Sequence, residues 1–272
     1  MVLGVYMYKR LLYLIILLSL QTYSLAAETS IRLGLFPYVN PAKLIEHHKS
    51  FIQHLEMSSG VRIQILTSPD YQTFLQRTRD NEFDIILTAP HFGRLAEIRD
   101  GFQRIAMTRH HVQGVYMVKS DSSIQNMTEL KSKRLTIAEP TSLIYRLAEQ
   151  QLREEYGLEN GKNIEIISSG NHNNAIYALI RGESEVTVTG INLYRGFIKT
   201  RGPMVRKIGE TKKIPGFMFM ANRDVSLQLV KRLKDAALDF AATEAGKNYV
   251  FHGYKEINDK TMRLLDAYTD NL

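Results

Sequence analysis

Residues 68–92 read SPDYQTFLQRTRDNEFDIILTAPHF, which predicts a helix followed by a buried strand. Asp70 follows a proline and is a good N-cap for a helix over residues 71–79. Residues 83–87 are mostly apolar, which is typical of a strand that is covered on both faces. A short connection at residues 88–91 (TAPH) then leads from this strand into the next helix. The stretch therefore predicts an α/β arrangement in which strands alternate with helices.

The same alternation extends through the chain in both directions, without an internal repeat or a low-complexity linker. Such alternation is typical of mixed, mostly parallel sheets flanked by helices. The further strands are expected at 31–36, 61–66, 102–107, 134–138, 163–167, 185–189 and 205–208, and the further helices at 41–57, 91–98, 142–156, 172–180, 227–243 and 259–266.

The first 26 residues have the three parts of a secretory signal peptide. Lys9 and Arg10 are basic, residues 11–20 are almost entirely apolar, and residues 21–26 end in small side chains. The apolar run is shorter than the roughly 20 residues that span a bilayer. We therefore expect cleavage before Ala27 and a periplasmic protein, with an uncleaved N-terminal anchor as the alternative.

Composition excludes several classes of function. The chain has 272 residues, 44% of them hydrophobic, so it can bury a substantial core. It has no cysteine, which excludes disulfides, thiol nucleophiles, thiolate metal sites and a lipidated cleavage site. Cleavage would lower the net charge from +7 to +5 by removing Lys9 and Arg10. The remaining positive charges are scattered, so we predict no nucleic-acid partner and favour an anionic solute.

Polar residues gather at four corners where a predicted strand leads into a predicted helix, at 68–71, 88–91, 139–142 and 168–172. The first turn of a helix has unpaired N–H donors and a positive dipole, which together bind anions. Each corner by itself is explained by ordinary helix capping. Since ligands of open α/β sheets bind beyond the carboxyl ends of strands, the four corners together predict one shared anion site.

Four stretches resemble the periplasmic binding proteins of phosphate, phosphite and phosphonate ABC transporters, which are type II periplasmic binding proteins. They are residues 68–92, residues 115–142 (VYMVKSDSSIQNMTELKSKRLTIAEPTS), residues 172–186 (HNNAIYALIRGESEV) and residues 213–217 (KIPGF). Their order and spacing cover nearly the whole mature chain. The resemblance implies two lobes, each with a mixed sheet flanked by helices. Lobe one would comprise 27–113 and 221–272, and lobe two 114–220.

The resemblance also implies which residues bind the oxyanion. Tyr71 matches the family's D-Y tyrosine, Ser142 matches the first serine of its S-T-S loop, and His172 matches the histidine of its H-x-x-x-x-A motif. Three nearby polar residues are further candidates for ligand binding: Thr141, Thr88 and His91.

The chain departs from the family pattern at the positions where family members bind the amino group of an aminophosphonate ligand. Asn192 and Phe217 stand at about the positions of two family carboxylates, and Leu143 replaces a loop hydroxyl. An unpaired buried ammonium group is costly, so we do not expect an aminophosphonate ligand. Asn192 itself remains a candidate for ligand binding.

The expected function is therefore capture of a small oxyanion, such as phosphate or a phosphonate, for uptake by the membrane permease of an ABC transporter. A periplasmic partner of a membrane histidine kinase or another receptor is the alternative. An enzyme on the same fold is less favoured, because no nucleophile motif or paired catalytic carboxylates occur. The eight histidines lack metal-site spacing, so we predict no metal, no cofactor and a monomer.

Overall fold

The structure is a computed structural model, and it describes residues 30–270 and residue 272. The predicted signal peptide lies outside the described residues. Residues 31–272 form one compact unit that contains two main sheets. None of the described helices is long and apolar enough to cross a membrane.

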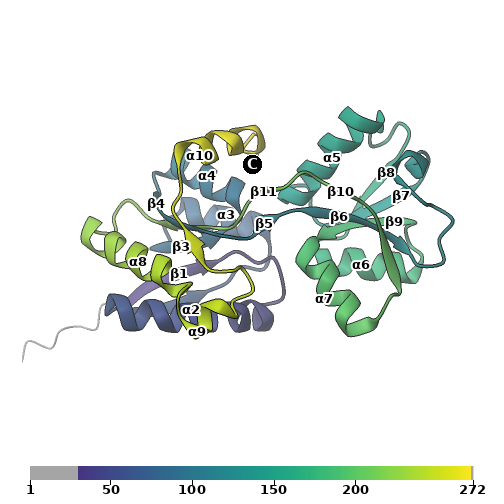
Figure 1. Cartoon of the computed structure of the whole chain (residues 1–272). Helices are drawn as coiled ribbons and strands as arrows, with labels where there is room; N and C mark the ends of the chain where they lie inside the picture. The colour runs from purple at the N-terminus through teal and green to yellow at the C-terminus, as the bar shows by residue number, and fades with distance from the viewer. Residues whose placement is uncertain (1–29, 271) are drawn as a thin grey trace, which may run out of the picture. The chain divides into compact units, whose positions relative to one another are not determined.

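The larger sheet has six strands in the order β13-β4-β12-β3-β1-β2 (Figure 1). β1 pairs with β3 in parallel, whereas β12 pairs antiparallel with both β3 and β4. β13 is antiparallel to β4. The strands are β1 (Ser30–Leu35), β2 (Arg62–Leu66), β3 (Ile85–Thr88), β4 (Gln103–Thr108), β12 (Met218–Ala221) and β13 (Tyr254–Lys255).

Helices cover both faces of this sheet, because its central strands are apolar on both sides. In β3, Ile85 and Leu87 pack with α2 (Pro41–Ser59) and α8 (Leu227–Phe240). Ile86 points the other way, as alternate strand residues must, and joins the core beneath the opposite helices. Those helices are α3 (Tyr71–Arg79), α4 (Pro90–Asp100) and α10 (Asp259–Leu265). The short helices α9 (Glu244–Lys247) and η2 (Asp266–Tyr268) complete this part of the chain.

The second sheet has five strands in the order β10-β6-β9-β7-β8. They are β6 (Gly114–Lys119), β7 (Arg134–Ile137), β8 (Glu165–Ser168), β9 (Val186–Gly190) and β10 (Val205–Glu210). One face packs against α5 (Leu143–Tyr156) and the other against α6 (His172–Arg181) and α7 (Ile191–Arg201). The short helix η1 (Met127–Leu130) packs its apolar side chains into the core on the α5 face.

A short two-stranded ladder carries the chain between the two main sheets. β5 (His111–Val112) pairs antiparallel with β11 (Ile214–Pro215). Residue 114, where the second lobe was expected to begin, is the first residue of β6, a strand of the five-stranded sheet. β12 belongs to the six-stranded sheet from Met218 onward, so the return passage ends before Met218.

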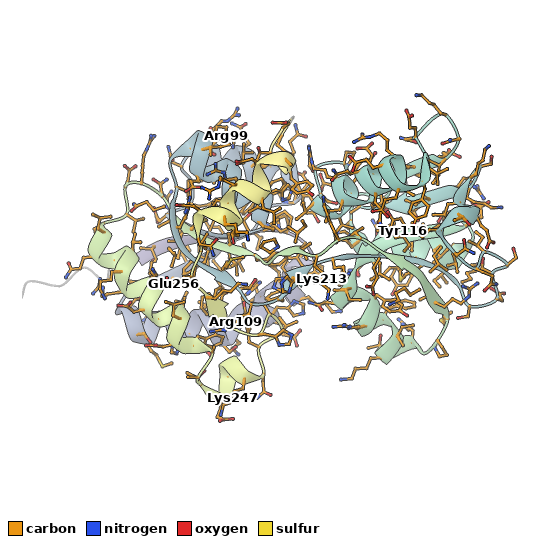
Figure 2. All side chains as sticks on the ribbon, turned by 45° about the horizontal axis from the view of Figure 1, so that its top comes forward. Arg99, Arg109, Tyr116, Lys213, Lys247 and Glu256 are labelled. Carbon is orange, nitrogen blue, oxygen red and sulfur yellow. The ribbon has the colours of Figure 1, made fainter. Side chains whose placement is uncertain are left out.

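Parallel pairing is less extensive than the sequence predicted. Besides β12 and β13, β6 runs antiparallel to both β9 and β10. Along the chain, β6 directly follows β5, and β10 and β12 directly precede and follow β11. Antiparallel pairing therefore occurs where the chain crosses between the two main sheets. The mixed α/β fold class itself is confirmed. Figure 2 shows Lys247 on the outside of the fold, whereas Tyr116 lies fully buried within the five-stranded sheet and its helices.

Candidate anion-binding site

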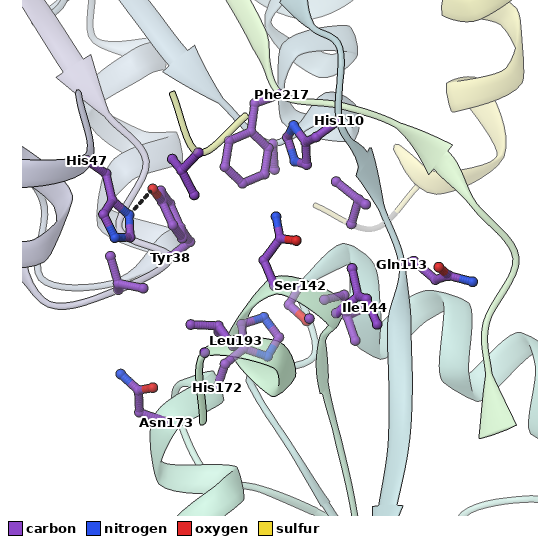
Figure 3. A pocket seen from close by; sticks show the side chains of 18 of the residues that line it. Tyr38, His47, His110, Gln113, Ser142, Ile144, His172, Asn173, Leu193 and Phe217 are labelled. Carbon is purple, nitrogen blue, oxygen red and sulfur yellow. Dashed lines mark hydrogen bonds between the residues drawn. The ribbon is translucent and has the colours of Figure 1, made fainter. Parts of the chain in front are cut away.

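A cavity of about 670 Å³ lies where the connections of both main sheets meet (Figure 3). This volume is within the range of sites that hold whole small organic molecules. The six-stranded part and the passages between the sheets contribute Phe36, Tyr38, Val39, Lys43, His47, Tyr71, Ala89, Pro90, His110, His111, Val112, Gln113, Phe217, Val250 and Phe251. The five-stranded part contributes Ser142, Leu143, Ile144, His172, Asn173, Ile176, Tyr177, Gly190, Ile191, Asn192, Leu193, Gly196, Phe197, Thr200 and Arg201.

Five helices begin at this cavity. α3, α4, α5, α6 and α7 supply Tyr71, Pro90, Ser142, His172 and Asn192 to its lining, each from the N-cap or the first turn. The positive ends of the five helix dipoles therefore face one space, which favours a negative charge there.

The helices differ in how their first turns are capped. The Ser142 hydroxyl oxygen accepts the N–H of Tyr145 at 3.0 Å, so this predicted binding residue is also an N-cap. α7 starts after Gly190, which offers no side-chain cap. The N–H of Ile191 donates to the carbonyl of Gln113 at 2.9 Å. Asn192 and Leu193, the next two residues of this uncapped turn, line the cavity.

Tyr71 is buried at the start of α3, with its ring 4.4 Å from that of Phe36. Desolvation by burial, and secondarily the charge of Glu139, raises the pKa of the Tyr71 phenol. The hydroxyl therefore stays protonated and can donate a hydrogen bond. The backbone N–H of Tyr71 donates to the carboxylate of half-buried Glu139, which follows β7.

His172 is buried at the start of α6, and its Nδ1 has no hydrogen-bond partner. Desolvation lowers the pKa of His172 to about 4, so the imidazole is neutral at pH 7. A neutral imidazole has one N–H donor and one acceptor nitrogen. An unpaired buried polar atom costs free energy. A bound ligand that gave Nδ1 a partner would remove that cost.

The other three polar candidates from the sequence lie beside the cavity but do not line it. His91 is fully buried, and its Nε2 donates to the carbonyl oxygen of Thr141 at 2.9 Å. The Thr141 hydroxyl donates to the carboxylate of Glu139 at 3.0 Å. Thr88 is buried at the end of β3, and its hydroxyl has no hydrogen-bond partner. The bonds of His91 and Thr141 can therefore position the loop that carries Ser142.

The charged side chains among the described residues that line the cavity are all positive. No aspartate or glutamate is among the lining residues that the structure describes, whereas exposed Lys43 and Arg201 are. Asn192 and Phe217, which stand where carboxylates were expected from the family pattern, both line the cavity. The cavity therefore offers an anion several donors and offers a ligand ammonium group no counter-charge. Within residues 30–270 and 272, no three His, Asp or Glu side chains are grouped to hold a metal ion.

Sequence reasoning missed the aromatic side of the cavity. Tyr38 lines it, and its hydroxyl lies 2.9 Å from Nδ1 of His47 and 3.3 Å from Nε2 of His48. Tyr38 sits in the corner between β1 and α2, which is itself a strand-to-helix corner. Applying the corner rule to the first strand as well would have identified it.

The family model described as "ABC transporter, phosphonate, periplasmic substrate-binding protein" matches residues 33–262. The chain belongs to this family. It is a periplasmic substrate-binding protein of the ABC-transporter class, and the family expected from the four sequence stretches is confirmed. The family consists of transport proteins rather than enzymes, and its partner is a membrane permease.

Solved structures share the fold at low sequence identity. PhnD1 from Prochlorococcus marinus, in complex with methylphosphonate, is 16% identical with a TM-score of 0.77, over 89% of this chain and 97% of that chain. A binding protein component of a phosphonate ABC transporter from Pseudomonas aeruginosa is 16% identical with a TM-score of 0.77, over 90% of each chain. XAC2383 from Xanthomonas citri, bound to ATP, is 17% identical with a TM-score of 0.70, over 89% of this chain and 96% of that chain. These likenesses confirm the type II periplasmic-binding-protein fold.

Proposed function

We propose that this protein captures a phosphonate or a closely similar oxyanion in the 670 Å³ cavity and presents it to the membrane permease of an ABC transporter. The observation that carries the proposal is the convergence of five helix starts on a cavity whose described lining contains no carboxylate. Positive dipole ends around a cavity whose described lining holds no carboxylate favour a compact anion.

The anion would be held by groups from both main sheets. The phenol of Tyr71 donates from the six-stranded side, while Ser142, His172 and Asn192 donate from the five-stranded side. Hydrogen bonds to a charged acceptor contribute about 1.5–3 kcal/mol each, more than bonds between neutral groups. The unpartnered Nδ1 of His172 supports its role, because a ligand can satisfy that buried atom.

The two lobes are part of the proposal. The sequence assigned 27–113 and 221–272 to one lobe and 114–220 to the other. We propose this division with the second boundary moved to before Met218, because β12 pairs with β3 and β4. An oxyanion bonded to Tyr71 on one lobe and to Ser142 and His172 on the other stabilises the closed arrangement. A ligand shifts such an equilibrium by its difference in affinity for the two states. The permease then recognises the closed state.

Export by a cleaved signal peptide accounts for delivery to the periplasm, where proteins of this family act. We propose cleavage before Ala27, as the small residues at Ser24 and Ala26 indicate. Mass spectrometry of the protein from a periplasmic extract should give an N-terminus at Ala27. Retention of residues 1–26 in the membrane fraction would instead support an anchored form.

We propose that the protein acts as a monomer and without catalysis. Ser142 and His172 line one cavity, but its described lining contains no carboxylate that could orient the imidazole. The sensing role that the sequence left as an alternative is not favoured by the family match. Incubation with phosphate or phosphonate esters should release no product.

A thermal-shift series tests the proposal directly. Methylphosphonate, phosphate, phosphite, sulfate and acetate are each added to the protein obtained by expressing the full chain. A ligand at about one hundred times its Kd adds about 2.7 kcal/mol to the free energy of unfolding, which raises the melting temperature measurably. The proposal predicts a rise with at least one phosphorus oxyanion and none with acetate. No rise with any of them at 10 mM would contradict it.

A further inference from the structure

One wall of the cavity is made of aromatic rings, which we call the ring wall: Phe36, Tyr38, His110, Phe217 and Phe251. Phe217 is its centre. The Phe217 ring centroid lies 4.9 Å from that of His110, 5.1 Å from those of Tyr38 and Phe251, and 6.3 Å from that of Phe36. Figure 3 shows Phe217, His110 and Tyr38 across the cavity from Ser142 and His172. The ring wall therefore lies apart from the proposed oxyanion donors on the five-stranded side.

Two polar atoms of the ring wall, the Tyr38 hydroxyl and Nδ1 of His110, already have hydrogen-bond partners within the protein. The Tyr38 hydroxyl lies within hydrogen-bonding distance of both His47 and His48. Nδ1 of His48 in turn lies 2.7 Å from the hydroxyl of Tyr249. Nδ1 of His110 lies 2.7 Å from the hydroxyl of Thr108. These bonds hold the Tyr38 and His110 rings in place. A preorganised wall of this kind binds an apolar group with little loss of side-chain entropy.

The ring wall also carries no charge at pH 7. Burial lowers the pKa of His110 to about 3, with the nearby His252 and His111 acting in the same direction, so its imidazole is neutral. The facing side of the cavity adds Leu143, Ile144 and Leu193. A cationic substituent placed between these two sides would lose its water without gaining a counter-charge.

We infer that the ligand is a phosphonate, or a phosphate monoester, with an aromatic substituent that packs on the ring wall while its oxyanion faces the helix starts. This inference rests on the proposed function and narrows its substrate class. The rings of the wall pair in tilted and edge-to-face arrangements at separations typical of favourable aromatic pairs. A planar aryl group can extend such packing, whereas a methyl group leaves most of the wall uncovered.

Isothermal titration calorimetry with four phosphonates tests the inference: phenyl-, cyclohexyl-, methyl- and 2-aminoethylphosphonate. The wild-type protein should bind phenylphosphonate at least tenfold more tightly than methylphosphonate or 2-aminoethylphosphonate, and more tightly than cyclohexylphosphonate. If methylphosphonate binds as tightly as phenylphosphonate, the ring-wall inference fails although the proposed function stands. If cyclohexylphosphonate binds as tightly as phenylphosphonate, the aromatic preference is wrong. If no phosphonate binds, the ring-wall inference fails, and the proposed function fails with it only if phosphate and phosphite also give no thermal shift.

Two variants separate ring packing from general stability. Phe217→Leu removes the central ring but keeps an apolar side chain, and should lower the ratio of phenyl- to methylphosphonate affinity about tenfold. Phe102→Leu loses a buried ring that does not line the cavity, and should leave that ratio unchanged. An unchanged ratio in Phe217→Leu, with methylphosphonate affinity retained, would overturn the inference.

Discussion

Nε2 of His91, in the first turn of α4, donates a hydrogen bond to the carbonyl oxygen of Thr141 at 2.9 Å. α4 packs on the six-stranded sheet, whereas Thr141 follows β7 of the five-stranded sheet. The bond therefore ties one part of the cavity wall to the loop that carries Ser142. Burial lowers the pKa of His91 to about 3, so the donor is a neutral imidazole at pH 7.

His91→Ala should lower both stability and ligand affinity. It removes the hydrogen bond to the carbonyl of half-buried Thr141, which costs about 0.5–1.5 kcal/mol in the free energy of unfolding, and it releases the Ser142 loop. Urea denaturation and calorimetry with methylphosphonate measure the two effects. His54→Ala is the matched control, because Nε2 of His54 donates to the carbonyl of Ala236 at 3.0 Å and His54 does not line the cavity. It should lower stability alone. Equal losses of affinity in the two variants would contradict a positioning role for His91.

Acid should destabilise the fold between about pH 6.5 and pH 4. Burial lowers the pKa of His48, His91 and His110 to about 3 and that of His172 to about 4. In this window the unfolded chain binds more protons than the folded one, so stability rises with pH and is lost as pH falls. Each such histidine contributes up to about 1.4 kcal/mol per pH unit. Urea midpoints measured from pH 7.5 to 4.5 test this, and a flat profile would show that these imidazoles are not held neutral.

Ligand affinity should itself gain from protonation of His172. The free protein holds the pKa of His172 at about 4 by desolvation, and a bound anion favours the imidazolium and raises that pKa. Binding therefore takes up protons between the free pKa of His172, about 4, and its higher pKa in the complex, and in that range affinity rises as pH falls. His172→Asn is the reference variant. The phosphonate itself titrates in the same way with both proteins, so the difference between their pH profiles isolates the contribution of His172. Identical pH dependence of Kd in the two proteins would remove His172 from the linkage.

Asn192→Asp should change which phosphonate is preferred. The substitution places a carboxylate in the first turn of α7, in a cavity whose described lining has none. An ammonium group of the ligand then gains a counter-charge, while the oxyanion meets a like charge. Competition calorimetry should show affinity for 2-aminoethylphosphonate rising relative to methylphosphonate by about tenfold. A ratio equal to that of the wild type would place Asn192 away from the bound substituent.

Most of the secondary structure was predictable, because local signals and burial agree. Residues 71–79 form α3 as expected, since Asp70 accepts the N–H of Thr73 at 2.7 Å. α7 was not predicted. Its N-cap is Gly190, which provides no capping signal, and none of its described residues is fully buried, so its apolar periodicity is weak.

The site was only partly predictable, because sequence places residues at corners but does not show which side chains reach the cavity. Tyr71, Ser142, His172 and Asn192 line it. Thr141 and His91 were candidates because they are polar residues in the same strand-to-helix corners, yet they bond to each other beside the cavity. The ring wall brings together residues that are distant in the chain, such as Tyr38 and Phe251, and no local sequence pattern predicts that contact.

The most direct test of the oxyanion site is calorimetry of methylphosphonate and phenylphosphonate with wild-type protein, Tyr71→Phe and His172→Ala. Each variant removes one hydrogen bond to a charged acceptor, and should weaken binding by about 1.5–3 kcal/mol, roughly 10- to 150-fold in Kd. Circular dichroism should show an unchanged fold. Wild-type affinity in both variants, for a phosphonate that does bind, would contradict the assignment of this cavity as the oxyanion site.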